Sequence, residues 1–219
     1  MYEPAVAPRP PQIPAVLERA QPAALEHDAT LCELELESLS MSDQNARGVT
    51  LEGVTLTAVE LAESRLEHLR VTDAVLTRCN LANVWAPGAL LSRVLIEGSR
   101  LTGVELAHAQ LTDVTIRDCR VDLASFAFSR LERVSFEDCL LPDAGFIDAQ
   151  LHSVRFERCD LTRVDVRGAR LAASEIRRCE LGGIEGVVSL RGASLEWATI
   201  VEHAGVWAAA LGIDVLDAE

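Results

Sequence analysis

The chain has 219 residues, 49% of them hydrophobic, and its 34 acidic against 20 basic residues give a formal net charge of −14. All the basic residues are arginines. This balance excludes a basic surface for nucleic acid, so we expect no direct nucleic-acid binding and partners that are basic proteins. The sequence has no apolar run long enough to span a bilayer, so we expect no membrane association.

The first 28 residues precede the regular part of the chain. Residues 1–14 hold five prolines, which predict an extended or disordered lead-in. Residues 15–28, with apolar Leu17 and Leu25, are predicted to cover the open N-terminal end of the region that follows. The start lacks the basic and apolar stretches of a secretory signal, so we expect a cytoplasmic protein.

A repeat of five residues dominates residues 29–195. From Leu31 to Leu181 every fifth residue is apolar, over 31 consecutive positions, and from Ala74 to Cys179 the residue two places before each of them is small. This period fits neither a helix at 3.6 residues nor a strand at 2. It indicates a solenoid in which one large and one small side chain of each unit point inward and the other three positions face water.

Cysteines and phenylalanines add a longer period of 20 residues. Phe126 and Phe146 are 20 apart, as are Phe136 and Phe156. Five of the six cysteines share one phase, which predicts one inward ladder: Cys79, Cys119, Cys139, Cys159 and Cys179. We interpret them as buried, reduced thiols; redox or metal chemistry is the alternative, and the chain has no CxxC pair for zinc. Cys32 lies outside this ladder and is the candidate reactive thiol.

Residues 29–185 resemble the pentapeptide-repeat family, whose units read Ala-(Asp/Asn)-Leu-x-x. The resemblance implies an all-β solenoid, a right-handed quadrilateral parallel β-helix of about eight 20-residue coils. Each unit would supply one side of the square, and coils would stack at the inter-strand spacing of about 4.8 Å.

The repeat register slips by one residue across residues 182–186 and resumes at Leu190 and Leu195. After it, residues 196–219 form a C-terminal helix and tail, with the helix predicted over 196–211 and ended by Gly212. Its apolar stripe either caps the last coil or forms a homodimer, as the resemblance to gyrase-directed members implies. The stripe comprises Trp197, Ile200, Val201, Ala204, Trp207, Ala208 and Leu211.

Two surface regions follow from assigning each residue to a face by its phase in the repeat. One face has an excess of acidic residues and is the candidate partner-binding face, although its charges can equally form a merely solvated surface. Its acids are Asp43, Glu60, Glu63, Asp122, Asp143, Asp160 and Glu180. Another face carries an apolar stripe that is either a protein interface or is covered by the N-terminal segment. This apolar stripe comprises Trp85, Pro87, Ala107, Ala127, Phe128 and Ile147.

The sequence contains no GxSxG, Gly-rich phosphate loop, HExxH or EF-hand pattern, so we predict no enzyme, no cofactor and no metal site. The best-known pentapeptide-repeat proteins bind DNA gyrase or topoisomerase IV and protect it from quinolones or peptide poisons. The resemblance therefore implies a DNA mimic that binds a type II topoisomerase. The alternative is a structural or scaffolding module that binds an unrelated protein through the apolar stripe.

Overall fold

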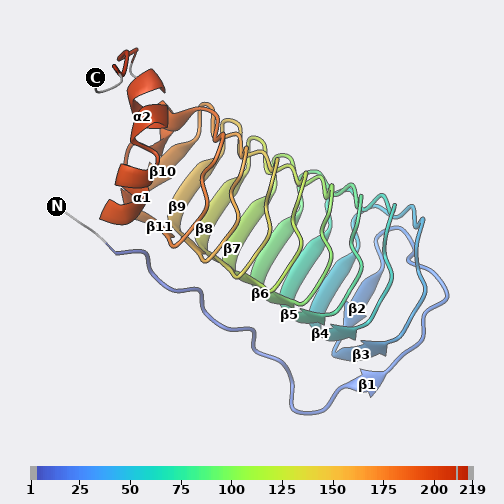
Figure 1. Cartoon of the computed structure of the whole chain (residues 1–219). Coiled ribbons are helices and arrows are strands. Elements are labelled where there is room, and N and C mark those ends of the chain that lie inside the picture. Colours follow the sequence, from blue (N-terminus) through green and yellow to red (C-terminus); the bar gives the residue numbers. More distant parts are fainter. Residues whose placement is uncertain (1–3, 211, 217–219) are drawn as a thin grey trace.

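Residues 20 apart in sequence lie beside one another in space, as the computed structural model shows (Figure 1). The structure describes residues 4–210 and 212–216. Parallel pairing connects each turn to the next, for example Leu111 to Leu131 and Phe136 to Phe156. The chain is a parallel β-solenoid of about nine turns with a short helical region at its C-terminal end, which confirms the predicted fold class.

The strands lie on two adjacent sides of each turn. They are β2 (Thr30–Cys32), β3 (Leu34–Glu37), β4 (Thr50–Thr57), β5 (Arg70–Thr77), β6 (Leu90–Glu97), β7 (Gln110–Arg117), β8 (Arg130–Glu137), β9 (Gln150–Glu157), β10 (Arg170–Ala172) and β11 (Ser174–Arg177). The other two sides pair through single-residue bridges, such as Arg100 to Arg120 and Glu105 to Ser125. Each turn of the chain thus adds a further parallel strand to the same ladder.

A left-handed backbone conformation at every fifth residue turns the chain through its corners. From residue 28 to residue 183 these 32 consecutive positions all have positive φ, between 47° at Ala173 and 72° at Gly48. Twenty-five of them are not glycine. L-residues adopt this conformation at a cost of about 1–2 kcal/mol, and aspartate, which tolerates it better than most, is the commonest residue at these corners. The apolar period predicted the sides of the rod but not these corners.

The interior contains the predicted columns of apolar side chains. Phe126 stacks on Phe146 with ring centroids 4.9 Å apart, and Phe136 stacks on Phe156 at 5.0 Å. The two stacks also meet edge to face, as Phe136 does with Phe146 at 6.2 Å. The ladder cysteines are all buried, as the sequence predicted, and Cys32 outside the ladder is exposed.

Residues 4–14 are extended and lie along the length of the rod (Figure 1). The chain then reaches the N-terminal end, where β1 (Glu18–Arg19) pairs with β3. Hydrogen bonds from Gln12 and Arg9 to Asp73 and Asp113 place this segment on the corner between the two strand-bearing sides. The alternative that this segment covers the apolar stripe of Trp85 and Phe128 is therefore wrong, because it runs along a different corner.

The C-terminal end closes the solenoid with a change of register. The 3₁₀ helix η1 (Val187–Leu190) precedes β12 (Ala193–Leu195), which pairs with β11 at an offset of 19 residues, Ser174 to Ala193. This confirms the predicted one-residue slip. Among the described residues no helix is long and apolar enough to cross a membrane.

The helical region differs from the single helix expected over 196–211. Two short helices, α1 (Trp197–Glu202) and α2 (Ala204–Ala210), are separated at His203. Thr199 and His203 are buried and Trp207 is half-buried, whereas Trp197 and Val201 are 79% and 57% exposed. The side that faces the rod is therefore a mixed polar and apolar one rather than the predicted stripe. Leu211, the last member of that stripe, lies outside the described residues.

We expect Phe146→Ala to lower the free energy of unfolding by about 3–5 kcal/mol, because the fully buried ring contacts three other phenylalanines. The measurement is urea denaturation followed by circular dichroism. Phe128→Ala is the matched control, because that ring is 54% exposed and its loss should cost less than about 1 kcal/mol. Equal losses in the two variants would contradict the central role of the stacked rings.

Candidate functional site

Oppositely charged side chains one turn apart line the corners of the rod. Four Asp–Arg pairs join corner residues that are 20 apart, with nitrogen–oxygen distances between 2.5 and 2.7 Å. They are Asp73–Arg93, Asp113–Arg133, Asp138–Arg158 and Asp143–Arg163. Hydrogen bonding from the arginine lowers the pKa of each of these aspartates. Much of the acidic surface is therefore neutralised locally by arginines of the next turn.

The candidate acidic face is not uniformly acidic in the structure. One of its columns runs through Ser40, Glu60, Asn80, Arg100, Arg120, Leu140, Asp160 and Glu180, each bridged to the next. The middle of this column is positive, and Arg120 also pairs with Asp122 at 3.1 Å. On the same face Asp143 pairs with Arg163. The face is thus acidic at its ends and basic or neutral between them.

At the N-terminal end of this face, two carboxylates accept hydrogen bonds from amide side chains rather than from arginines. Glu60 accepts a hydrogen bond of 2.7 Å from Asn80, and Glu63 accepts one of 2.6 Å from Asn83. These glutamates and Asp43 are exposed. An amide leaves the negative charge of its partner intact, so Asp43, Glu60 and Glu63 form an exposed acidic patch on the face. We call it the acidic end.

The apolar stripe contains one prominently exposed ring. Phe128 is 54% exposed and stacks on the His108 imidazole, with centroids 5.1 Å apart and planes 13° from parallel. The other members of the stripe are half-buried: Trp85, Pro87, Ala107, Ala127 and Ile147. The Arg65 guanidinium lies 5.4 Å from the Trp85 ring centroid, over its face. The stripe therefore offers a partner one aromatic anchor on a shallow apolar surface.

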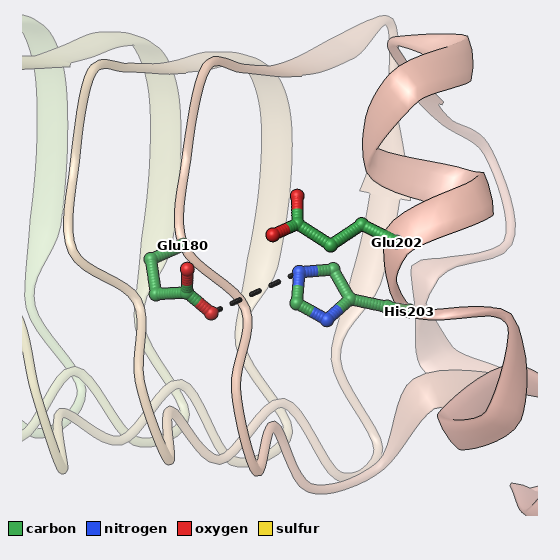
Figure 2. A group of neighbouring side chains, drawn as sticks. All are labelled: Glu180, Glu202 and His203. Carbon is green, nitrogen blue, oxygen red and sulfur yellow. Dashed lines mark ion pairs between the residues drawn. The ribbon is translucent and has the colours of Figure 1, made fainter.

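The junction between the last turns and α1 brings together Glu180, Glu202 and His203 (Figure 2). The His203 side chain is buried, and its Nε2 lies 3.9 Å from Glu180 Oε1. One ligand-type atom from each of the three residues lies within 4.8 Å of the others, so these are the described side chains that could hold a divalent cation together. The sequence did not reveal this group, because the spacing of 22 residues from Glu180 to Glu202 matches no metal motif. The group lies where the helix docks on the rod.

The cysteine ladder has the properties of packing residues. Burial raises the pKa of the Cys79 thiol, and hydrogen bonding to Cys139 together with burial raises that of Cys119. The Cys139 sulfur donates to the carbonyls of Ile116 and Glu137 at 3.3 and 3.2 Å. The five ladder thiols are buried in the core, and all six cysteines of the chain are free of disulfides. Thiolate chemistry is therefore disfavoured along the ladder.

An apolar cavity lies inside the N-terminal half of the rod. Leucines and valines line it, among them Leu56, Leu76 and Leu101. In the C-terminal half the stacked phenylalanines occupy the corresponding space. The cavity has no polar lining that could orient a substrate, so it is a consequence of packing with smaller side chains.

Comparison with known proteins supports the class of protein that the repeat indicates. Residues 124–185 match the family model described as "Pentapeptide repeat region". This part of the chain is thus a pentapeptide-repeat region, as the sequence predicted. No curated protein matches it.

Two solved structures similar to this one are also pentapeptide-repeat proteins. A trypsin-treated variant of QnrB1, described as a plasmid-mediated fluoroquinolone resistance protein, aligns with a TM-score of 0.59 and 15% identity over 93% of this chain and 100% of its own. HetL, involved in heterocyst differentiation regulation in the cyanobacterium Nostoc sp. strain PCC 7120, aligns with a TM-score of 0.47 and 17% identity over 77% of this chain and 87% of its own. At these identities the likeness concerns the fold.

Acid should weaken the rod through the Asp–Arg corner pairs. The folded-state pKa of Asp73, Asp113, Asp138 and Asp143 lies below the unfolded value of about 3.9, so their contribution to stability is present above about pH 4 and is lost as pH falls through the folded values. We expect the urea midpoint to fall steeply below pH 4.

Arg133→Gln should flatten that acid transition, because Asp113 then loses the guanidinium that depresses its pKa most strongly. Arg70→Gln is the control, since Arg70 is an exposed residue outside the corner pairs. Identical pH profiles for the wild type and Arg133→Gln would contradict this origin of the acid sensitivity.

Proposed function

We propose that this protein is a non-catalytic rod that binds a type II topoisomerase in place of DNA and protects it from topoisomerase poisons. The observation that carries the proposal is a solenoid over which QnrB1, a fluoroquinolone resistance protein, aligns along its whole length. A rod with net charge −14 would be drawn to a surface built for phosphates. No step in this function requires a catalytic group.

Charge density limits where the mimicry can lie. About nine turns at about 4.8 Å make a rod about 43 Å long, so the charge of the whole chain amounts to roughly one net negative charge per 3 Å. Duplex DNA carries about one per 1.7 Å. The average surface is therefore only about half as dense in charge as DNA, and a topoisomerase contact must use a region that is locally more acidic.

The acidic end of Asp43, Glu60 and Glu63 meets this requirement. Its carboxylates are exposed, and the hydrogen bonds from Asn80 and Asn83 hold two of them without neutralising them. The central part of the same face, with Arg100 and Arg120, would repel a basic protein surface. We therefore propose the acidic end, rather than the whole face, as the contact.

A scaffolding role is the second candidate function, and the exposed Phe128 ring favours it. Aromatic side chains are common anchors at protein interfaces, and this one is already ordered by stacking on His108. A partner seated there would cover the half-buried Ala107, Ala127 and Ile147 on either side. This role needs no acidic contact and no topoisomerase.

The first experiment is a gyrase supercoiling assay with the purified protein titrated in, with and without a quinolone. We expect inhibition of supercoiling or rescue from the drug at micromolar protein, weakening as salt rises. Asp43→Asn/Glu60→Gln/Glu63→Gln should raise the half-effective concentration at least tenfold. We expect this weaker effect because the variant removes three negative charges from the proposed contact.

Glu105→Gln/Asp118→Asn/Glu185→Gln is the matched control, because it removes three exposed carboxylates from elsewhere on the rod and should change the half-effective concentration less than twofold. Equal effects of the two triple variants would show that only net charge matters. No effect of the wild type on gyrase or topoisomerase IV would contradict the topoisomerase role. A partner lost on Phe128→Asp but retained by the acidic-end variant would support the scaffold.

We also propose that the rod pairs with a second copy through its C-terminal end. Trp197 and Val201 lie four residues apart on α1 and are 79% and 57% exposed, and Val188 on η1, at the same end of the chain, is 67% exposed. In sedimentation equilibrium we expect a dimer for the wild type and a monomer for Val201→Glu. Val16→Glu, at an 83% exposed position far along the rod, should leave the dimer intact. A wild-type monomer at micromolar concentration would refute the pairing.

A further inference from the structure

The N-terminal segment lies on the rod with a period of three residues. Ala5 is buried and Pro8, Pro11 and Pro14 are half-buried, whereas most residues between them are exposed. A polyproline II helix has three residues per turn, so every third residue of such a segment faces the same way. Five prolines within residues 4–14 fix φ near the value that this helix requires.

The backbone amides of this segment donate to carboxylates of the rod. Gln12 N–H donates to Asp73 Oδ1 at 2.9 Å, Arg9 N–H donates to Asp113 Oδ1 at 3.1 Å, and Ala5 N–H donates to Glu175 Oε1 at 3.1 Å. Proline has no N–H, and the prolines of the segment occupy none of these three donor positions. The segment therefore packs prolines against the rod and donates backbone amides to the carboxylates of the rod.

The spacing of the amide donors along the segment matches the spacing of the carboxylate acceptors along the rod. Asp73 and Asp113 are two turns apart, about 9.6 Å at the inter-strand spacing, and Arg9 and Gln12 are three residues apart, about 9.3 Å in a polyproline II helix. From Arg9 to Ala5 the segment advances about 12 Å, against about 14 Å for the three turns to the β11 turn. The longer side chain of Glu175 spans the difference.

The corner column under the segment is built for this register. It reads Gly53, Asp73, Arg93, Asp113, Arg133, so aspartates occur on alternate turns. Each arginine holds the aspartate of the turn before it, with Arg93 Nε 2.7 Å from Asp73 Oδ1 and Arg133 Nε 2.7 Å from Asp113 Oδ1. At the end of the column a Cβ on Gly53 would lie 3.1 Å from Pro14 Cδ, so the glycine makes room for the proline ring.

The far acceptor is equally fixed. Glu175 on β11 is 1% exposed, and its Oε2 lies 2.9 Å from Arg177 Nε and 3.3 Å from Arg155 Nε. Asp113 is likewise only 4% exposed. Buried carboxylates held by arginines in this way present preorganised oxygens to incoming amide donors, which limits the entropic cost of binding.

We propose that this corner, from Gly53 through Asp73 and Asp113 to Glu175, is a binding site for a proline-rich peptide in the polyproline II conformation. The chain's own residues 4–14 occupy it. A proline-rich segment of another protein with amide donors in the same spacing would bind there when the chain's own segment leaves. This inference is independent of the topoisomerase contact, which uses a different corner of the rod.

The first test is amide hydrogen exchange of Ala5, Arg9 and Gln12, measured by NMR on the full chain. Asp73→Ala/Asp113→Ala should speed exchange of Arg9 and Gln12 at least tenfold. Asp138→Ala/Asp143→Ala is the matched control, because it removes two corner aspartates that also pair with arginines but do not touch the segment. Equal exchange in the two variants, or unprotected amides in the wild type, would overturn the proposal.

The second test uses a fluorescein-labelled peptide with the sequence of residues 4–14 and measures its binding by anisotropy. Full-length Arg9→Pro/Gln12→Pro removes two amide donors of the resident segment while leaving its conformation favourable, so the peptide should bind this variant at least tenfold more tightly than it binds the wild type. Val6→Pro changes an amide outside the three donors and should behave as the wild type does.

Adding Asp73→Ala/Asp113→Ala to the donor variant should abolish the peptide binding. The proposal is overturned if the peptide fails to bind the donor variant although exchange shows that its segment has been released. It is also overturned if binding survives the loss of both aspartates. A peptide with its prolines moved by one residue should bind at least tenfold more weakly than the native sequence, because its faces and donors no longer coincide with the column.

Discussion

The left-handed corner at every fifth residue is the constraint on which the rest of this structure depends. Four such corners close each turn, so residues 20 apart are brought into register and identical side chains stack. The corners also point their side chains outward in columns, where one strand spacing separates neighbours. A left-handed backbone position repeated 32 times, and strained at the 25 that are not glycine, thus becomes the framework for the charge pairs at the surface. The stacked apolar interior and the parallel ladder compensate for that strain.

The solenoid could be predicted from the sequence because the same five-residue apolar pattern recurs in many units. The apolar column and the 20-residue ladders of cysteine and phenylalanine each mark an inward position. An apolar residue type that recurs at one position of a repeat indicates directly that this position is buried. The corners were not predictable in this way, since aspartate, arginine, histidine and even Phe128 all occupy them. Their common property is a backbone angle, and in this chain only the seven glycines and the more frequent aspartates among them hint at it. The break between α1 and α2 at His203 likewise depends on how the helices dock against the rod, and the apolar periodicity of the helical segment does not indicate this.

The surface features were predicted less completely, for a related reason. Phase alone assigned Asp122 and Asp143 to an acidic face, and the structure places both there but beside Arg120 and Arg163. A net charge summed over a face cannot distinguish paired from unpaired carboxylates, so the acidic end emerged only from side-chain contacts. The role of residues 4–14 was harder still to predict from the sequence. Their prolines indicated an extended conformation, but the carboxylates that hold them lie as many as 170 residues away in sequence.

The bonded N-terminal segment also bears on how such a rod can change in length. In most solenoids one repeat can be gained or lost with little effect elsewhere, because each turn contacts only its neighbours. Here a single extra turn between Asp73 and Asp113 would move one acceptor by about 4.8 Å and leave the Arg9 and Gln12 amides out of step with it. Two extra turns accompanied by three extra residues in the segment would restore the match. The segment therefore acts as a ruler that permits the rod to grow in pairs of turns.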